Sequence, residues 1–197
     1  MTALLVVSDD HWGARAEASV PAGADIVVAV DRSGGLSRLI KLILRGSLPL
    51  RAAVQILLAQ LRLPRDRPRS DSNLSDNTDL RVLAQAHGAR EVILFRAGLI
   101  ISGKTLELCQ IRNIHCADIG SFGGLAAIWR ALRAGALDQR ATLHRVTNRI
   151  DEGEVLDTEP FCLNPSLGYA ANETLAYEAG LRLLQRTLYR LHQVVAL

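Results

Sequence analysis

Two polar side chains stand two residues apart at the end of a predicted strand, residues 112–115 (RNIH), directly before a glycine-containing loop. Because side chains alternate along a strand, Asn113 and His115 point to the same side. An amide can donate a hydrogen bond to a developing oxyanion and an imidazole can move a proton, which are the two demands of acyl transfer. An Asn-x-His triplet alone is a weak signal, so this prediction needs partners elsewhere in the chain.

A carboxylate that could serve the imidazole lies in a polar turn at 147–153 (TNRIDEG), between two predicted β segments. A carboxylate close to His115 would orient the ring and stabilise its protonated form, so we expect Asp151 to raise the pKa of His115. By itself an Asp-Glu-Gly sequence is only a turn.

The elements that must position these groups follow from the apolar pattern. Continuous apolar runs at 3–8, 25–31 and 91–95 predict buried strands of a parallel sheet covered on both faces. Strands that alternate with helices predict an α/β domain of three layers with a mostly parallel, twisted sheet. In such sheets ligands bind beyond the carboxyl ends of the strands, which is where the triplet at 113–115 ends.

The remaining elements come from the same patterns and from their glycine and proline stops. We predict one domain over 1–197, with a polar, proline-broken mobile loop around 64–79 and a C-terminal helix around 173–194. The other predicted elements are helices at 80–87 and 125–134, a short helix within 103–109, and β segments at 141–146 and 154–163 that pair as neighbours.

Residues 36–63 carry apolar side chains at helical spacing, which predicts two amphipathic helices separated by Gly46 and Pro49. Packing on the sheet or on a partner subunit is favoured over a membrane-surface role. Since these helices supply more apolar surface than one small sheet covers, we predict a homodimer that uses them.

Composition narrows the class of protein. The 197 residues are 49% hydrophobic and 22% charged with a formal charge of +3, as in an ordinary soluble globular domain. The positive excess is local to the loop at 62–69, so a nucleic-acid partner is disfavoured.

Three cysteines without metal-ligand spacing indicate a reducing compartment. The N-terminus has no basic leader and no segment is apolar enough to span a bilayer, so we expect a cytoplasmic protein without a membrane partner.

Taken together, residues 112–156 resemble the folate-dependent formyltransferase family, which includes glycinamide ribonucleotide transformylase, methionyl-tRNA formyltransferase and the sugar-nucleotide N-formyltransferases. The family shows a strand ending in Asn-x-His, a loop, a Gly-Leu pair, a helix, Thr-x-His-x-Val and then a turn of the form Ile-Asp-x-Gly. The matching positions here are Asn113 and His115, Gly124-Leu125, Ala131-Leu132 to Gly135, Thr142-Leu143-His144, and residues 150–156 (IDEGEVL). Their order and spacing agree with the family throughout.

The resemblance implies a Rossmann-like formyltransferase fold, 10-formyltetrahydrofolate as formyl donor, no metal, and an amine as acceptor. It assigns oxyanion stabilisation to Asn113, charge stabilisation and proton transfer to His115, and orientation of His115 and proton acceptance through a water to Asp151. The candidate folate neighbours that it implies are Arg96, Ala97, Gly98, Leu99, Ile100, Asn148, Arg149, Ile150 and Gly153.

Several residues near these motifs carry two interpretations. His144 is either a partner of the catalytic residues or a strand histidine with a local hydrogen bond. His11 and Trp12 follow the first strand, where they are substrate-binding candidates, although core packing is favoured for the tryptophan. Asp118 could meet a cationic acceptor, but hydration is favoured. For Cys116, a small buried thiol is favoured over a nucleophile or zinc ligand.

The sequence also narrows the acceptor. The phosphate-binding glycine loop of the glycinamide ribonucleotide enzymes is replaced after the first strand by VVSDDHW, and the C-terminal barrel of the tRNA enzymes does not follow the last helix. Both acceptors are therefore disfavoured, which leaves a small-molecule amine such as an amino-sugar nucleotide or a natural-product intermediate. The alternatives are a formyltetrahydrofolate hydrolase and a non-catalytic folate- or nucleotide-binding module.

Overall fold

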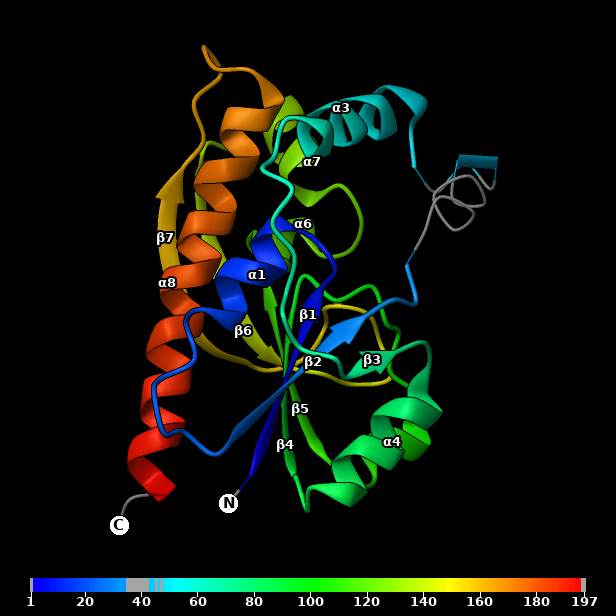
Figure 1. Cartoon of the computed structure of the whole chain (residues 1–197). Coiled ribbons are helices and arrows are strands. Elements are labelled where there is room, and N and C mark those ends of the chain that lie inside the picture. The colour runs from blue at the N-terminus through cyan, green and yellow to red at the C-terminus, as the bar shows by residue number, and fades with distance from the viewer. Residues whose placement is uncertain (1, 35–42, 45, 47, 196–197) are drawn as a thin grey trace.

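The computed structural model describes residues 2–34, 43, 44, 46 and 48–195. Within this part of the chain, seven strands form one sheet in the order β3-β2-β1-β4-β5-β6-β7 (Figure 1). Of the six neighbouring pairs, the four among β3, β2, β1, β4 and β5 are parallel, and β5–β6 and β6–β7 are antiparallel, so the predicted α/β class with a mostly parallel sheet is confirmed. The strands are β1 Ala3–Ser8, β2 Ile26–Asp31, β3 Asn73–Leu74, β4 Glu91–Phe95, β5 Gln110–His115, β6 Asp138–Arg145 and β7 Val155–Cys162.

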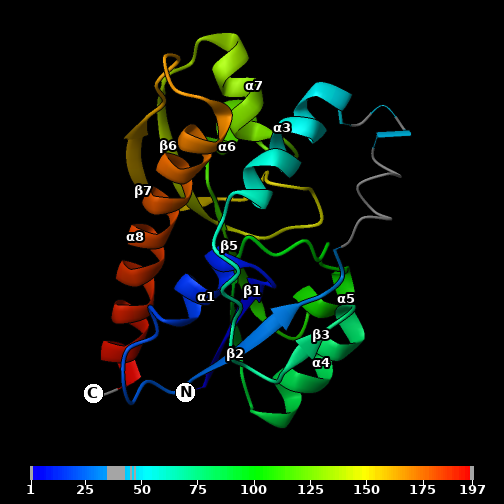
Figure 2. The same cartoon turned by 45° about the horizontal axis from the view of Figure 1, so that its top comes forward.

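Helices cover the sheet on both faces, which gives the predicted three layers (Figures 1 and 2). Alternate side chains of β1 enter different cores: Leu5 packs with the elements on the α1 and α8 side, and Leu4 with those on the α4 side. The helices are α1 His11–Glu17, α3 Leu50–Leu61, α4 Asn77–Ala86, α5 Gly103–Leu106, α6 Ile119–Phe122, α7 Ala127–Ala134 and α8 Tyr169–Val195. The central strands are therefore sealed, and only their ends can offer groups to a ligand.

The segment expected to be one loop at 64–79 is shorter than predicted. Residues 73–74 form β3, which pairs with the end of β2, and Asp76 caps α4 by accepting hydrogen bonds from the N–H groups of Thr78 and Asp79. Two paired residues are too few to give an alternating pattern, and the aspartate-rich sequence that resembles a loop is here a helix cap. The mobility of residues 64–72 stays a prediction.

Helix bounds also differ from the predicted ones. α8 begins at Tyr169, four residues before the expected start. α7 begins at Ala127, two residues after the expected start, and is followed by Gly135, which has the left-handed backbone that favours a helix C-terminus. The predicted pairing of the two late β segments is confirmed by the antiparallel β6–β7 ladder. Of the two amphipathic helices expected at 36–63, residues 36–42 lie outside the described residues, and α3 is the second.

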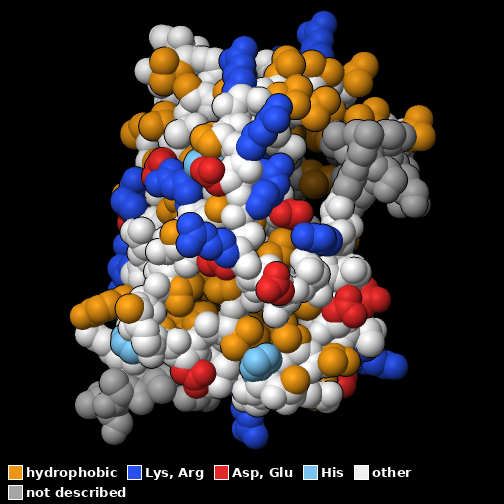
Figure 3. All heavy atoms as spheres, viewed as in Figure 1, with side chains coloured by type: hydrophobic (Ala, Val, Ile, Leu, Met, Phe, Trp, Pro, Cys, Tyr) orange, Lys and Arg blue, Asp and Glu red, His pale blue; other side chains and the backbone are white. Residues whose placement is uncertain are grey.

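α3 has an apolar outer surface. Ala52 and Ala53 are buried against the start of α7, whereas the other side of α3 leaves large apolar side chains exposed, among them Leu50, Val54, Leu57, Leu58 and Leu61. Figure 3 shows hydrophobic side chains gathered at this end of the molecule. The homodimer that would cover them stays a prediction, which light scattering at micromolar concentration tests. No helix among the described residues is both long and apolar enough to cross a membrane.

Candidate active site

A cleft of about 1470 Å³ opens along the carboxyl ends of the parallel strands. Its lining includes the last residues of β1, β2 and β5 and the residue that follows β4, which are Ser8, Asp31, His115 and Arg96. Pockets that hold one drug-sized ligand are usually about 300–1,000 Å³. The cleft is therefore large enough for two reactants that meet inside it.

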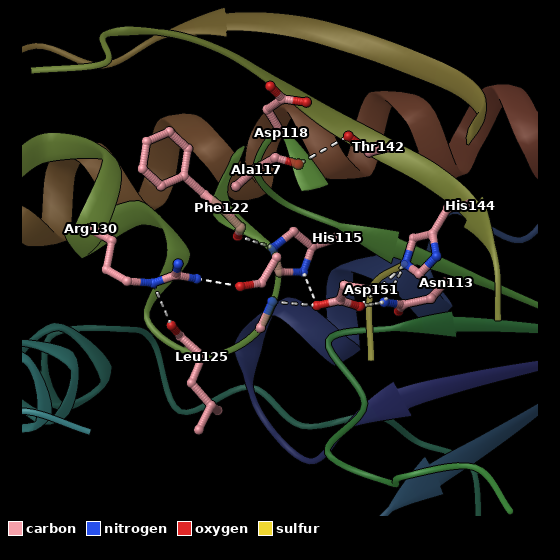
Figure 4. Close-up of polar contacts among 12 residues, drawn as sticks. Asn113, His115, Ala117, Asp118, Phe122, Leu125, Arg130, Thr142, His144 and Asp151 are labelled. Atoms are coloured by element: carbon pink, nitrogen blue, oxygen red, sulfur yellow. Dashed lines mark hydrogen bonds and ion pairs between the residues drawn. The ribbon is translucent and has the colours of Figure 1, made fainter. Parts of the chain in front are cut away.

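The structure brings Asn113, His115 and Asp151 together in this cleft (Figure 4). Asn113 and His115 lie on the same side of β5, and the loop after β6 carries Asp151 back to them. The Asp151 carboxylate is 3.2 Å from Nδ1 of His115 and 3.4 Å from the amide nitrogen of Asn113. A carboxylate, an imidazole and an amide thus converge on one point, an arrangement that can move protons and stabilise an oxyanion.

Asp151 is the hub of this cluster. Its Oδ2 accepts a 2.7 Å hydrogen bond from the backbone N–H of Gly124, and its Oδ1 lies 3.3 Å from Nε2 of His144. Burial acts to raise its pKa, but the hydrogen bond with His144, the charge of His115 and the Gly124 N–H together lower the pKa of Asp151 to about 2. This carboxyl is therefore ionised throughout the physiological range.

His115 does not titrate as the sequence suggested. Its side chain is only 14% exposed, and this burial lowers the pKa of His115 below its ordinary value, against the opposing effects of Asp151 and the Phe122 carbonyl. The expected rise is wrong because the loss of hydration outweighs the nearby carboxylate. Nε2 lies 3.1 Å from the Phe122 carbonyl oxygen while Nδ1 faces Asp151, so the neutral ring can take up a second proton without moving.

His144 is a direct neighbour of the cluster. β6 pairs with β5 so that His144 lies opposite Asn113, and its Nε2 is 3.1 Å from the Asn113 amide nitrogen. Its Nδ1 donates to the carbonyl oxygen of Arg145 at 3.1 Å, and its Nε2 faces both the Asn113 amide nitrogen and Oδ1 of Asp151. The side chain is almost fully buried. His144 is therefore both a buried strand histidine with a local hydrogen bond and a neighbour that orients Asn113.

The loop over the cluster is fixed by Arg130 of α7. Its guanidinium donates to the carbonyl oxygens of Gly123 and Leu125, the latter at 3.1 Å (Figure 4). This holds the Gly124 N–H towards Asp151. Gly123 leaves little room, because an added Cβ would lie 3.2 Å from the Asp151 side chain. The close approach of this loop to Asp151 therefore depends on a residue without a side chain.

Backbone strain gathers in the same cleft. Among the described residues, the non-glycine residues with positive φ are Arg96 (56°), Ala126 (54°) and Asp151 (52°), and all three line it. Side chains other than glycine rarely adopt this region, and it persists where the surroundings enforce it, which is often at functional sites. The strain thus supports the cleft as the functional part of the molecule.

Most of the candidate folate neighbours line the cleft, namely Arg96 to Ile100 and Asn148 to Ile150. Gly153 does not, and this assignment is corrected: a Cβ there would lie 1.6 Å from the carbonyl oxygen of Arg145, so the glycine permits close packing of the turn on β6. Buried Asp31 accepts hydrogen bonds from the N–H groups of Gly98 and Leu99. A ring bound beside these residues would need other donors.

Of the two substrate-binding candidates that follow β1, one lines the cleft and one does not. His11 lines the cleft and its Nδ1 lies 3.2 Å from Asp66. Trp12 is only 2% exposed and packs 5.2 Å from the ring of Tyr177 in the core, so the substrate-binding interpretation of this residue is wrong. The ring is buried because Trp12 of α1 packs into the core between the sheet and α8.

Two further candidates lie apart from the reacting groups. Asp118 is not among the cleft-lining residues; it pairs with Arg140 at 3.5 Å and with Ser121, apart from the cluster in Figure 4. Its assignment to the substrate is therefore also corrected. Cys116 is buried, and burial raises its pKa to about 12, so it remains a thiol rather than a nucleophilic thiolate.

Several cleft residues were not identified from the sequence. Asp31 ends a predicted strand, so its position alone could have marked it. Tyr169, Glu173 and Tyr177 are spaced by four residues and share one face of α8. A polar stripe at this spacing on an otherwise apolar helix was the available signal. Among the described residues no group of three or more His, Cys, Asp or Glu side chains could hold a metal ion.

Comparison with known proteins places this site in a family. The model of the formyl transferase family matches residues 54–162, more than half of the chain, including β5, β6 and the Asp151 turn. No curated protein matches the sequence.

Solved formyltransferases share the fold at low sequence identity. Phosphoribosylglycinamide formyltransferase from Streptococcus pneumoniae TIGR4 is 19% identical, with a TM-score of 0.63 over 97% of this chain and 99% of that one. Glycinamide ribonucleotide transformylase 1 from Geobacillus kaustophilus is 19% identical, with a TM-score of 0.64 over 98% and 100%. A sugar N-formyltransferase from Shewanella sp. FDAARGOS_354 is 13% identical, with a TM-score of 0.63 over 98% and 71%. The chain therefore belongs to the formyl transferase family.

Proposed function

We propose that this chain is an N-formyltransferase that moves the formyl group of 10-formyltetrahydrofolate to the amine of a small molecule, such as an amino-sugar nucleotide or a natural-product intermediate. The observation that carries the proposal is the contact of Asp151 with both His115 and Asn113 inside a cleft large enough for two reactants. Family membership supports the reaction type.

The folate fits the side of the cleft formed by residues 97–101 and 146–150, where apolar side chains such as Leu99, Ile101 and Val146 could cover a flat ring. Bound there, it supplies a formyl carbon attached to a nitrogen that can leave. We assign the second reactant to the side that carries Asp10 and Glu173. The side chain of Arg96, a candidate folate neighbour in the sequence, contacts Asp10 and is therefore assigned to this side as well.

In the reaction, the acceptor nitrogen forms a bond to the formyl carbon and the bond to the folate nitrogen breaks. Asn113 would turn one amide N–H, which faces Asp151 at 3.4 Å in this structure, to the oxygen that gains negative charge, a contribution that elsewhere is worth about 10²–10³ in rate. Asp151, ionised at neutral pH, would take the proton lost by the amine, directly or through a water. Neutral His115, whose Nδ1 faces Asp151, would take up this proton and deliver it to the folate nitrogen as that bond breaks.

Incubation of the protein with 10-formyltetrahydrofolate and a panel of primary amines tests the proposal. Mass spectrometry should show an acceptor that gains one formyl group, with tetrahydrofolate formed in equal amount. His115→Asn should abolish turnover and leave folate binding largely intact, whereas His87→Asn, on the exposed end of α4, should have no effect.

Two results would contradict the proposal. Tetrahydrofolate that appears without a formylated amine, at a rate no amine increases, would identify a formyltetrahydrofolate hydrolase. Folate binding without any turnover by the unsubstituted protein would identify a binding module.

A further inference from the structure

Arg96 is an unusual residue in the wall of the cleft. It follows β4 directly, has a left-handed backbone with φ of 56°, and keeps its side chain only 11% exposed. An arginine is rarely buried without a partner, and glycine would be the easier residue at this backbone geometry. The position of the guanidinium thus needs an explanation beyond packing.

Two contacts fix the guanidinium. Its Nε donates to Oδ2 of Asp10 at 2.6 Å, and its central carbon lies 4.4 Å from the centre of the Tyr177 ring. Asp10 is itself held, since its Oδ1 accepts from Ser8 and from the backbone N–H groups at the start of α1. One edge and one face of the guanidinium are therefore occupied by rigid neighbours.

The other edge is not occupied by protein. Within the described part of the chain, the two terminal nitrogens of Arg96 donate no hydrogen bond, and neither is among the buried polar atoms without a partner. Because Arg96 lines the cleft, this pair of donors borders its open space. A fixed pair of N–H donors of this geometry matches the two oxygens of a carboxylate or phosphate.

The neighbouring charges favour the smaller anion. Glu173 of α8 lies near Arg96 and is 4% exposed; Tyr169 donates a 3.3 Å hydrogen bond to its carboxyl. Burial raises the pKa of Glu173, which favours its neutral form. Because Asp10 already neutralises Arg96, a doubly charged phosphate would be repelled by the Asp10 carboxylate more strongly than a singly charged carboxylate.

The sheet register places this anchor beside the proposed chemistry. Phe95 of β4 pairs with Ile114 of β5, so Arg96 and His115 are the next residues along two adjacent parallel strands. Such strands are about 4.8 Å apart. A ligand held at Arg96 can therefore extend an amine towards His115 and Asn113 with only a few bonds between its two groups.

We propose that the unoccupied edge of Arg96 binds a carboxylate of the acceptor, so that the substrate is an amine that carries a carboxylate group a few bonds from the reacting nitrogen. This inference rests on the proposed function for the identity of the amine as acceptor. The binding of the carboxylate itself does not depend on turnover.

Calorimetric titration of the full chain with matched probes tests the inference. The probes are β-alanine, 4-aminobutyrate and 3-aminobenzoate, each paired with its carboxamide, and O-phosphoethanolamine as the phosphate. For at least one pair we expect the carboxylate to bind roughly 10- to 100-fold more tightly than the carboxamide, as for hydrogen bonds to charged groups. Arg96→Met should remove this preference without changing carboxamide binding.

A matched control is available in Arg15, which also lies over an aromatic ring and pairs with an acid but is not among the cleft-lining residues. Arg15→Met should retain the preference. Since Arg96→Met leaves Asp10 without its ion pair, the double variant Arg96→Met with Asp10→Asn, which keeps an N-cap side chain, guards against a loss caused by unfolding.

Four results would overturn the inference. The first is equal binding of every carboxylate and its carboxamide, including no detectable binding of either up to about 50 mM. The second is that the folded Arg96 variants keep the preference for the carboxylate, and the third is that Arg67→Met, at the exposed rim of the cleft, loses that preference. The fourth is tighter binding of O-phosphoethanolamine than of β-alanine. If carboxylates bind at Arg96 but no amine is formylated, the proposed function fails and the carboxylate site remains.

Discussion

Asp151→Asn should make the stability of this protein less dependent on acid. The substitution keeps the shape of the side chain and removes the charge that faces His115, His144 and the Gly124 N–H. The pKa of Asp151 is lowered from 3.8 to about 2 in the folded protein, and the side chain is only 11% exposed. At 1.36 kcal/mol per pH unit, this corresponds to about 2 kcal/mol of stabilisation by the ionised form.

The sign follows from the direction of the shift. A carboxyl whose pKa is depressed on folding contributes its full stabilisation above the unfolded value of 3.8, and loses it as the pH falls from there towards 2. The free energy of unfolding should therefore be about 2 kcal/mol lower for Asp151→Asn than for the unsubstituted chain at pH 6–7. This difference should shrink towards zero near pH 2.

Urea unfolding at pH 7, 5, 4 and 3 measures this difference. Because Asp151 also affects the titration of His115, the same comparison is repeated with His115→Asn in both chains, which removes that contribution. A difference that stays constant from pH 7 to 3 in that background would refute the assignment of a strongly acidic, charge-stabilised Asp151. So would equal stability of the two chains at pH 7.

Three further predictions follow from the site. Asn113→Ala should reduce kcat by about 10²–10³ with little change in folate affinity, measured by steady-state turnover and calorimetry; an unchanged kcat would contradict its role. The pKa of His115 is lowered by burial, so the loss of kcat/KM that its protonation causes should have a midpoint below the ordinary value of 6.5. A midpoint above 6.5 would contradict this. The pH profile of His115→Gln shows whether the acidic decline in kcat/KM is due to His115. Gly153→Ala should destabilise the fold by at least about 3 kcal/mol, because its Cβ would lie 1.6 Å from the Arg145 carbonyl oxygen, while Gly34→Ala, with nothing within 4 Å, should be neutral in thermal unfolding.

The layers and the parallel strands could be predicted because they depend on local patterns. Apolar runs such as 3–8 and 91–95 are long enough to identify a strand buried on both faces, and Gly135 marks the end of a helix through its backbone alone. β3 could not be predicted, since two residues pair there only because β2 already presents an open edge.

The catalytic candidates could be predicted because they stand in sequence motifs that resemble those of a known family. The contact of Asp151 with His115 spans a loop of unknown path, so the resemblance indicated it and the local pattern did not. The pKa direction of His115 was wrong because burial is a property of the assembled fold. The side-chain role of Arg96 was hidden for a similar reason, since its partners Asp10 and Tyr177 lie far from it in the sequence.

Apart from Arg96, the two sides of the cleft come from separate parts of the polypeptide. Asn113, His115 and Asp151 come from one stretch inside the family match at 54–162, whereas the turn after β1 and the first turns of α8 lie outside it. Mutation could therefore diversify one side while leaving the other intact. Exchanging residues 8–11 and 169–177 between formyltransferases would be a direct way to redirect such an enzyme to new amines while keeping its reaction.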